Sequence, residues 1–441
     1  MITKMKNIAI ELGLIEAEAD GRKYIDDFES EMLRGLAGEK SSLLMLPTYI
    51  SQEELRFSPG YETISADNEK VIVIDAGGTN LRIALVELGT GAPKIVYFNK
   101  YLIPGFGAPV SVEEFFDKLA EYLKPIITES DRIGFCFSNP AEILPDRDAR
   151  IITFTKEVVV TGSEGVLLGE SLNAALRSRG LPYDKRIVVL NDTVATQLSA
   201  MSDSNVRAAH SGFIGLILGT GINASYSEAN EFIKKSDILC QKTGTTIINT
   251  EAGGYDGFPQ NMADARFIQA TGDPEYHKFE KMASGGYQNK LLLEWIGYAA
   301  EKGAFSTAFS KKAELIEHLP IEDIGRFYTS SGDNILSDLC TQADDLEKMR
   351  QMIEAFYDRI GFMTAAVLTG MLKRMGNEGK TPERPVCISA EGSTFYKAVL
   401  LRSAVIRYMN RYARGEFGYY YEFMRIEDAT ILGSAAAGLV K

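Results

Sequence analysis

The sequence contains little cysteine and histidine, the residues that most often build disulfides, zinc sites and acid–base pairs. Its 441 residues include three histidines, none at metal-ligand spacing. Four cysteines occur without a Cys-x-x-Cys pair, namely Cys136, Cys240, Cys340 and Cys387. These absences argue against a disulfide-bonded scaffold, a zinc site and a histidine-dependent mechanism. Scattered reduced thiols are typical of a cytoplasmic protein, which is the location we expect.

The sequence also lacks long apolar runs and an excess of positive charge. No apolar stretch reaches the ~18 residues that indicate a membrane span. The first residues, MITKMKNIAIELG, have no sustained apolar region and no small-residue cleavage site, so we expect no signal peptide. The formal net charge of −13 argues against nucleic acid or an anionic membrane as partner. A nucleotide remains possible, because backbone N–H groups can bind phosphates locally.

Apolar strands and helical segments alternate along the chain, which predicts an α/β fold. The length is large for a single core and favours two lobes. We expect several strands in residues 71–103 and single strands at 133–137, 187–190, 213–218 and 386–389. We expect helices at 20–38, 111–123, 165–178, 193–201, 353–375 and 398–411, and an Ala/Gly-rich helix at the C-terminus.

The stretch VIVIDAGGTNLRIALVEL, residues 71–88, contains a glycine turn between two apolar segments. It matches neither the P-loop pattern nor the G-x-G-x-x-G dinucleotide pattern, both of which open a helix. Successive N–H groups of a strand–turn–strand form a nest for anionic oxygens, here from Gly77, Gly78, Thr79 and Asn80. Asp75 at the strand end suits a hydrated Mg²⁺ ion. The alternative is a plain hairpin with an incidental aspartate.

A second stretch, LILGTGINASYSE, repeats the same order of strand, Gly/Thr/Asn turn and strand. This repeated pattern favours two lobes built alike, each presenting a turn to the cleft between them. Two unrelated hairpins would give the same sequence pattern. The turn from Gly219 to Gly221 would then bind the other side of the same phosphates. A Glu391-Gly392-Ser393 turn after an apolar strand would lie near a nucleoside.

Asp192 follows a buried strand, where α/β proteins bind their ligands. Its carboxylate is a candidate base for a transferred group. An equally simple interpretation is that Asp192 caps the helix that follows, because aspartate is favoured at that position. Both roles are compatible, since a helix N-terminus holds a carboxylate in place.

An ordered set of short motifs resembles the hexokinase family, the ATP-dependent hexose kinases that include glucokinase. The motifs cover nearly the whole chain. In order they are LMLPTYI (44–50), DAGGTNLR (75–82), GFCFSNP (134–140), FTK (154–156), NDT (191–193), LILGTGINASY (216–226), INTEAGG (248–254), FEKMASGGY (279–287) and EGS (391–393).

The resemblance implies a role for each matching residue. Asp192 would be the general base for the sugar 6-hydroxyl, assisted by Lys156. The sugar would contact Ser138, Thr155, Lys156, Asn191, Asp192, Asn223, Glu251 and Glu280. ATP would contact Asp75, Gly77, Gly78, Thr79, Asn80, Arg82, Gly219, Thr220, Gly392 and Ser393, with Mg²⁺ held by Asp75 through water. Carboxylates, amides and hydroxyls are suitable partners for a ring of sugar hydroxyls.

The resemblance also implies a two-lobed actin-like (ribonuclease H-like) ATPase fold with its site in the cleft. We expect residues 1–65 to pack on the large lobe and 66–190 to form the small lobe, joined by a C-terminal helix at 428–441. Residues 191–427 would form the large lobe. The implied partners are a hexose, most simply glucose, and ATP, in a monomer or homodimer.

Other functions compete with an active glucose kinase. They are a kinase for mannose or fructose, a non-catalytic sugar sensor and an actin-like nucleotide switch. The sugar-binding carboxylates and Asp192 disfavour the last two. The chain departs from the family at Asn139, at residues 252–255, in a short segment at 257–278, and at Glu391, where Asp is usual. These departures concern the sugar preference and the loops at the cleft edge.

Overall fold

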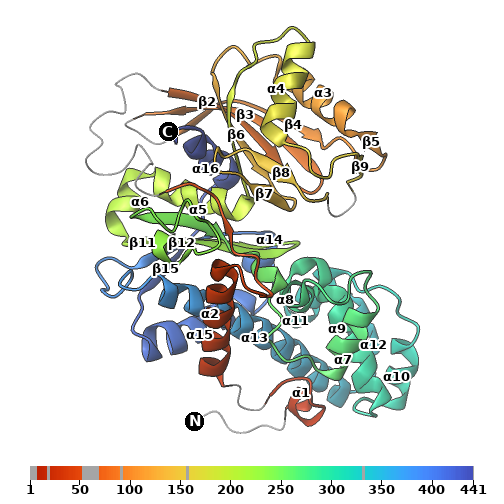
Figure 1. The fold of residues 1–441 in the computed structure, drawn as a ribbon. Coiled ribbons are helices and arrows are strands. Elements are labelled where there is room, and N and C mark those ends of the chain that lie inside the picture. Colours follow the sequence, from red (N-terminus) through yellow and green to blue (C-terminus); the bar gives the residue numbers. More distant parts are fainter. Residues whose placement is uncertain are drawn as a thin grey trace.

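The computed structural model describes residues 7–16, 20–51, 69–89, 93–154, 158–329 and 333–440. They form two lobes, each built around one sheet and its helices (Figure 1). We call the lobe of the five-stranded sheet the first lobe and that of the six-stranded sheet the second lobe. The predicted α/β, two-lobed architecture is confirmed.

The first lobe carries a sheet in the order β10-β6-β2-β3-β4. Its strands are β2 (Glu69–Ala76), β3 (Asn80–Leu88), β4 (Lys94–Leu102), β6 (Arg132–Phe137) and β10 (Arg186–Leu190). The central strand β2 is buried from Val71 onward, as its unbroken apolar run predicts. Apolar residues of α3 (Val112–Leu123) and α4 (Leu168–Ser178) complete this core, and Ser111 caps α3.

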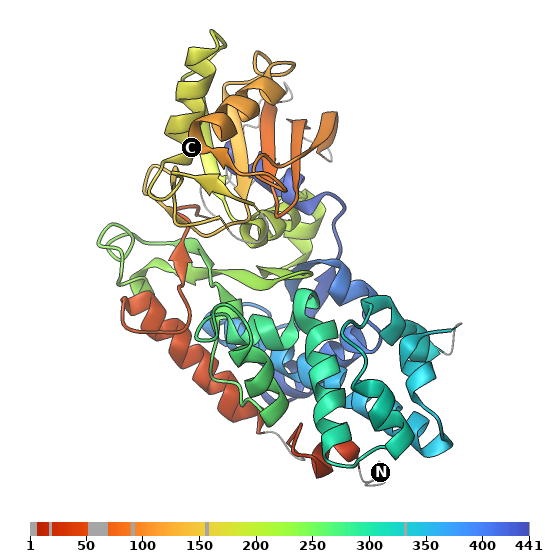
Figure 2. The same ribbon diagram turned by 90° about the vertical axis from the view of Figure 1, so that its right-hand side faces the viewer.

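The second lobe carries a sheet in the order β1-β13-β12-β11-β14-β15. Its strands are β1 (Leu46–Pro47), β11 (Gly212–Leu218), β12 (Ile222–Ala229), β13 (Thr245–Asn249), β14 (Val386–Glu391) and β15 (Tyr421–Met424). Its core includes apolar residues of α2 (Gly21–Ala37), α13 (Ala343–Arg374) and α15 (Leu401–Met409). Figure 2 shows α2, in red, along this lobe.

The repeated sequence pattern corresponds to the same strand arrangement in both sheets. Strand β2 pairs antiparallel with β3 and parallel with β6. Strand β11 pairs antiparallel with β12 and parallel with β14. The two glycine turns therefore occupy equivalent places in the two lobes, and the interpretation as unrelated hairpins is wrong.

Helices α5 (Asp192–Ser202) and α16 (Ala429–Gly438) pack against each other between the two sheets. Helix α16 also contacts β2 and β6 of the first lobe, while α5 contacts β11, β12 and β14 of the second. Their apolar residues join strands of both lobes in one core. This helix pair is thus the main packed connection between the lobes.

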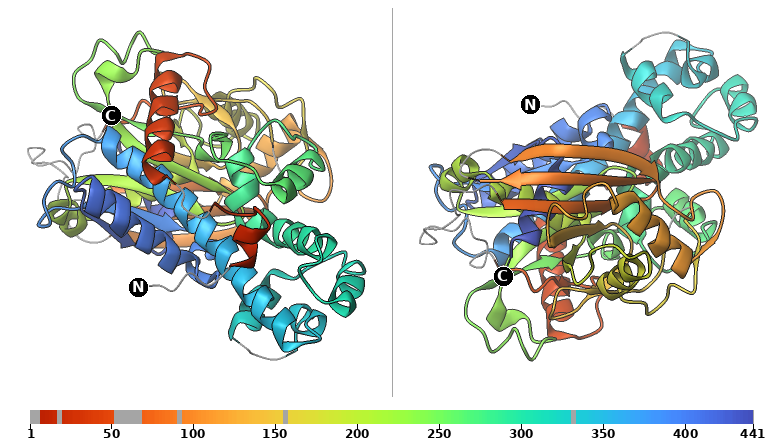
Figure 3. Two further views of the ribbon diagram at one scale, coloured as in Figure 1. Left: turned by 90° about the horizontal axis from the view of Figure 1, so that it is seen from below. Right: turned by 90° about the horizontal axis from the view of Figure 1, so that it is seen from above.

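The remaining elements are short strands in the first lobe and helices in the second. The strands are β5 (Val110–Ser111), β7 (Ala141–Ile143), β8 (Ala149–Ile151) and β9 (Val160–Thr161). The helices are α1 (Ile8–Glu11), α6 (Ser204–Ala209), α7 (Met262–Gln269), α8 (Lys278–Ala283), α9 (Gly285–Glu301), α10 (Thr307–Ala313), α11 (Ile321–Thr329), α12 (Ile335–Leu339) and α14 (Ser393–Lys397). In Figure 3 the helices of residues 307–339 extend outward at one corner.

Three predicted helices differ from the observed ones. Helix α4 begins at Leu168, because Gly165 adopts a left-handed turn at φ +78°. Helix α13 begins at Ala343, ten residues before the expected start, since apolar spacing continues through the buried Met349. The segment 398–411 is not one helix: Leu400, at φ +65°, precedes α15, and a π-helical turn follows it.

The described residues contain no helix with the length and apolarity that a bilayer span requires. All four cysteines are free thiols. Cys136 and Cys387 are buried, whereas Cys240 and Cys340 are half-buried. No disulfide joins any two of them in the described part of the chain.

Candidate active site

Three parallel strands of the first lobe end side by side at one edge of the sheet. Strands β2, β6 and β10 are in register, so that Asp75 pairs with Cys136 and Cys136 with Leu190. The residues that follow are the glycine turn, Ser138 and Asn191-Asp192. Carboxyl ends of parallel strands are where such sheets bind ligands.

The first glycine turn, residues 77–80, is a tight hairpin tip. The N–H of Gly77 donates to the carbonyl of Asn80 at 3.0 Å. Thr79 is exposed, and the two glycines and Asn80 are half-buried. The Thr79 carbonyl accepts from the N–H of Ile103 at 3.0 Å, which fixes the tip to the end of β4.

Asp75 is buried below this tip and is held by two side chains. Its Oδ2 lies 2.6 Å from an Arg82 guanidinium nitrogen and accepts a 2.9 Å hydrogen bond from the Thr430 hydroxyl. Arg82 also donates to Thr430 at 3.3 Å. The carboxylate, the guanidinium and the C-terminal helix α16 therefore form one unit at the cleft.

The second glycine turn, residues 219–221, is packed between two other elements. The Gly219 carbonyl accepts from the N–H of Gly285 at 2.8 Å and from the Thr394 hydroxyl at 3.0 Å. Gly392 adopts φ +111°, and a Cβ there would lie 2.3 Å from the Leu218 carbonyl oxygen. Only glycine fits at position 392, so the third turn is pressed against the second.

The two lobes meet at this point. Burial raises the pKa of the Glu391 carboxyl, and the charges of Arg425 and of Arg82 oppose that rise. Arg82 belongs to the first sheet and Glu391 to the second, so these two side chains from different lobes lie near enough for their charges to interact. Burial raises the pKa of the Cys136 thiol, and the charges of Asp75 and Asp192 add to the effect. Both carboxylates therefore lie near the same thiol.

A network of amides and carboxylates lies on the second-lobe side of the cleft. The Asn223 amide nitrogen donates to Asn249 at 2.9 Å, to Asn191 at 3.4 Å and to Glu251 at 3.5 Å. Asn249 in turn donates to Glu251 at 2.7 Å. The structure thus brings together three of the predicted sugar residues, which come from three separate segments of the chain.

Glu280 lies beside the second tip, close to this network. Its Oε2 accepts from the N–H of Ile222 at 3.1 Å, and a Cβ at Gly221 would lie 2.6 Å from the same oxygen. Glu251, in a left-handed conformation at φ +52°, is the other acidic group here. Burial raises the pKa of Glu251 to about 7, an effect that Asn249 opposes and that the charges of Asp192 and Glu280 reinforce.

The interpretation of Asp192 as the helix cap is wrong. Helix α5 is capped by Asn191, whose Oδ1 accepts from the N–H and the hydroxyl of Thr193 at 2.9 and 2.6 Å. Asp192 is instead the first residue of the helix and is half-buried. An acidic residue in the first turn of a helix interacts favourably with the helix dipole.

Two of the predicted residues, Thr155 and Lys156, lie outside the described part of the chain. Ser138 follows β6 and its N–H donates to the Ala76 carbonyl at 3.1 Å. Ser393 begins α14, directly after Gly392. The roles of all the predicted site residues stay predictions.

Sequence reasoning missed Asn249 and Thr430. Asn249 is 5% exposed and orients both Asn223 and Glu251. A polar residue at the end of the apolar strand TTIIN was the available signal. Thr430 had no such signal, because its contact with Asp75 joins residues 355 positions apart.

The predicted magnesium ion, which would arrive with a nucleotide, stays a prediction. Among the described residues, no three His, Cys, Asp or Glu side chains are arranged to hold a metal ion alone. Mg²⁺ is commonly bound through one or two carboxylates, water and substrate phosphates. Asp75, next to the first glycine tip, is the donor that suits this mode.

Family models described as Hexokinase match residues 13–202 and 213–440. The chain is 30% identical over 408 residues to hexokinase-4, chloroplastic, from Oryza sativa subsp. japonica, covering 85% of this chain and 76% of the rice protein. It is 29% identical over 299 residues to hexokinase-2 of Candida albicans, covering 64% and 58%. It is 26% identical over 392 residues to hexokinase-3 of Rattus norvegicus, covering 83% and 40%. The chain therefore spans about three quarters of the rice relative and about two fifths of the rat relative.

Solved structures share the fold at lower identity. A hexokinase from Schistosoma mansoni complexed with glucose superposes with a TM-score of 0.73 at 23% identity, covering 98% of each chain. A second hexokinase crystal structure gives 0.76 at 20% identity, covering 99% of this chain and all of the other. At these identities the likeness shows the fold alone.

Proposed function

Because this chain belongs to the hexokinase family, we propose that it transfers the γ-phosphoryl group of ATP to the 6-hydroxyl of a hexose, with glucose preferred. One observation carries the proposal. A network of Asn191, Asn223 and Glu251 adjoins two glycine tips that come from opposite lobes. Groups suited to bind sugar hydroxyls and phosphates would therefore share one site.

Positioning and charge stabilisation do most of the work in phosphoryl transfer. Asn223 and the carboxylates of Glu251 and Glu280 would bind the sugar hydroxyls. The backbone N–H groups of both tips, with Arg82, would hold the phosphates. Arg82 is suited to this role, because Asp75 and Thr430 fix its guanidinium while its side chain stays 33% exposed. When bound, Mg²⁺ would neutralise phosphate charge beside Asp75.

Asp192 would be the general base. A sugar alcohol is too weakly acidic to lose its proton to a carboxylate before the reaction begins. Asp192 would therefore orient the hydroxyl and accept its proton as the new P–O bond forms. Its place at the start of α5 favours this role, because the helix holds the carboxylate in position.

Water competes with the sugar as the nucleophile. Closure of the lobes on the bound hexose would complete the site only when sugar is present, as in induced fit. The α5–α16 pair is the main packed connection across which such a closure would occur. We further propose a cytoplasmic location and a monomer or homodimer, on the grounds of scattered thiols and acidic charge.

A coupled assay with MgATP and each of glucose, mannose, fructose and N-acetylglucosamine tests this proposal. We expect turnover with glucose at the highest kcat/KM. If kcat/KM were highest with mannose or fructose, that sugar would replace glucose as the preferred substrate. If calorimetry showed sugar binding but no hexose were turned over, the proposed enzyme activity would be wrong and a sugar sensor would be favoured.

A further inference from the structure

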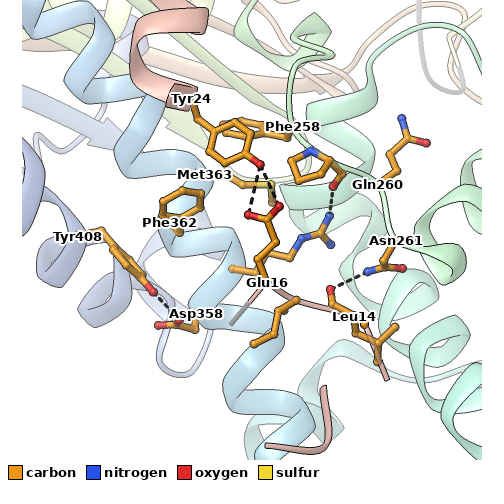
Figure 4. Close-up of a pocket in the computed structure, with 14 residues that line it drawn as sticks. Leu14, Glu16, Tyr24, Phe258, Gln260, Asn261, Asp358, Phe362, Met363 and Tyr408 are labelled. Atoms are coloured by element: carbon orange, nitrogen blue, oxygen red, sulfur yellow. Dashed lines mark hydrogen bonds between the residues drawn. The ribbon is translucent and has the colours of Figure 1, made fainter. Parts of the chain in front are cut away.

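A cavity of about 360 Å³ lies in the second lobe, outside the residues of the candidate active site. It is enclosed by the N-terminal segment before α2, by α2, by the segment before α7, and by α13 and α15. Figure 4 shows its lining residues. The volume is in the range of small-molecule sites, and the proposed phosphoryl transfer makes no use of it.

The floor of the cavity is aromatic and apolar. Tyr24, Phe258, Phe362 and Met363 are all buried. The Tyr24 ring lies 5.8 Å from the ring of Phe258 and 5.8 Å from that of Phe362, edge-on to the latter. Aromatic faces attract a flat apolar group and also a cation placed over them.

Two carboxylates stand over this floor from different elements. Glu16 accepts from the Tyr24 hydroxyl at 3.3 Å, and Asp358 accepts from the Tyr408 hydroxyl at 2.6 Å. Figure 4 shows Glu16 beside Tyr24 and the Asp358–Tyr408 pair on the far side of Phe362. Asp358 also pairs with Arg407, whereas Glu16 is exposed and forms no ion pair with another residue in the described part of the chain.

Two cations lie at or beside the cavity, because the Lys23 ammonium is 5.3 Å from the centroid of the Tyr24 ring and Arg359 belongs to the lining. Arg359 is, among the described lining residues, the one cation, and it lies 2.6 Å from the fully buried carboxylate of Asp264. It also donates to the Pro259 carbonyl at 3.0 Å. Among the lining residues themselves, the two carboxylates of Glu16 and Asp358 exceed the single guanidinium of Arg359 by one negative charge. The lining therefore favours a cationic ligand over a phosphate or a carboxylate.

We propose that this cavity is a second ligand site, for a small organic cation with an apolar or aromatic body. The apolar body would occupy the Tyr24–Phe258–Phe362 floor, and the cationic group would pair with Glu16. The Tyr24 hydroxyl keeps the Glu16 carboxylate directed over the floor. A free sugar fits poorly, because the floor offers few hydrogen-bonding groups.

The floor is in direct contact with the elements that hold the sugar carboxylates. The Phe258 ring lies 4.8 Å from Tyr255 and 5.2 Å from Phe279. Tyr255 follows the short helical turn after Glu251, and Phe279 immediately precedes Glu280. The N–H of Phe279 donates to the Tyr255 carbonyl at 3.1 Å, which joins the two segments. A ligand that fixes Phe258 therefore steadies both carboxylates, and we infer that it tightens hexose binding.

Calorimetry on the full chain, with phenethylammonium as the probe, tests the site. Size-matched 3-phenylpropionate and 3-phenylpropanol serve as the anionic and neutral controls. We expect the cation to bind at least about tenfold more tightly than the anion, which corresponds to one favourable charge contact. Equal binding of all three probes, or no binding of the cation, would overturn the proposal.

Variants assign the probe to this cavity. Glu16→Gln keeps an acceptor for the Tyr24 hydroxyl but removes the negative charge. It should lower the affinity for the cation about tenfold and leave the affinity for the neutral probe unchanged. Glu317→Gln, a change at an exposed glutamate away from the cavity, is the matched control and should have no effect. Unchanged affinity in Glu16→Gln would place the probe elsewhere and contradict the assignment.

The coupling to the sugar site is measured separately. The Kd for glucose is determined with and without saturating phenethylammonium, and we expect it to fall severalfold when the cation is present. An unchanged glucose Kd would refute the coupling while leaving the binding site in place. Because glucose binding is measured without turnover, failure of this experiment is distinguishable from failure of the proposed kinase activity.

Discussion

Gly433 of α16 packs directly on Ala195 of α5. A Cβ at position 433 would lie 1.7 Å from the Ala195 carbonyl oxygen. On the other side of α16, a Cβ at Gly134 of β6 would lie 1.8 Å from the Ser434 carbonyl oxygen. The two lobes are therefore joined through a helix that touches its neighbours backbone to backbone, and Asp192 begins the helix on one side of that contact.

Gly433→Ala is expected to destabilise the protein, because the added methyl group must push α16 away from α5. Overpacking of this kind costs about 1–3 kcal/mol in the free energy of unfolding. Thermal unfolding measures the loss. Gly297→Ala in α9, where a Cβ meets nothing within 4 Å, is the matched control and should be neutral or slightly stabilising. Equal stability of Gly433→Ala and the wild type would refute the close packing.

Gly392→Ala is expected to raise the KM for ATP and leave the glucose Kd unchanged. The substituted residue would be strained at φ +111° and would displace the second glycine tip through Leu218. Steady-state kinetics and calorimetry separate the two effects. Gly303→Ala, at φ +70° with open space around the site, controls for backbone strain alone. A raised glucose Kd with normal KM for ATP would contradict the placement of this turn beside the nucleotide.

Glucose binding is expected to release protons near pH 7. Burial raises the pKa of Glu251 to about 7 in the sugar-free protein, so that much of it is protonated there. Sugar hydroxyls that donate to the carboxylate favour its ionised form and lower the pKa. Calorimetry in two buffers of different ionisation enthalpy measures the release, which should vanish in Glu251→Gln. Proton uptake by the wild type would contradict this account.

The same pKa predicts how stability depends on pH. Below the ordinary value of 4.5, folded and unfolded chains both hold the Glu251 proton, so the residue has no net effect. Between 4.5 and about 7 only the folded chain holds it, so the folded state becomes progressively less favoured as pH rises. Glu251→Gln should therefore raise the melting temperature at pH 8 and leave it unchanged at pH 4. A stabilisation of equal size at both pH values would show that charge is not the cause.

Asn249→Ala is expected to weaken glucose binding and to move its pH midpoint upward. Asn249 donates to Glu251 at 2.7 Å and opposes the rise of the Glu251 pKa, so its loss favours the protonated form. The glucose Kd measured from pH 6 to 9 gives both effects. Asn230→Ala removes a similarly buried amide away from the site and should leave the glucose Kd unchanged. A midpoint that does not move would exclude Asn249 from the tuning of Glu251.

Much of this fold was readable from local sequence signals. The buried strands β2, β6, β10 and β11 follow unbroken apolar runs, and Ser111 and Gly38 mark helix ends as expected. The glycine turns were predicted because their spacing excludes helix-opening loops. The expected helix 398–411 was only partly right, because Leu400 adopts a left-handed conformation just before α15. No local sequence pattern predicts that conformation at a leucine.

The residues that sequence reasoning missed act over long distances in the chain. Thr430 meets Asp75, and Asn249 meets Asn223, only because the two sheets and α16 bring them together. The interpretation of Asp192 as the helix cap was wrong, because Asn191, one residue earlier, occupies the capping position. The predicted domain boundaries at residues 65, 190 and 427 and the oligomeric state stay predictions.

The most direct test of the account is the turnover of Asp192→Asn measured beside its glucose affinity. We expect kcat to fall by at least about 100-fold, the usual contribution of a general base, while the glucose Kd stays within a few fold of the wild type. Asp237→Asn, at an exposed aspartate, is the control and should retain full kcat. Full turnover by Asp192→Asn would contradict the central claim that this carboxylate accepts the proton of the sugar alcohol.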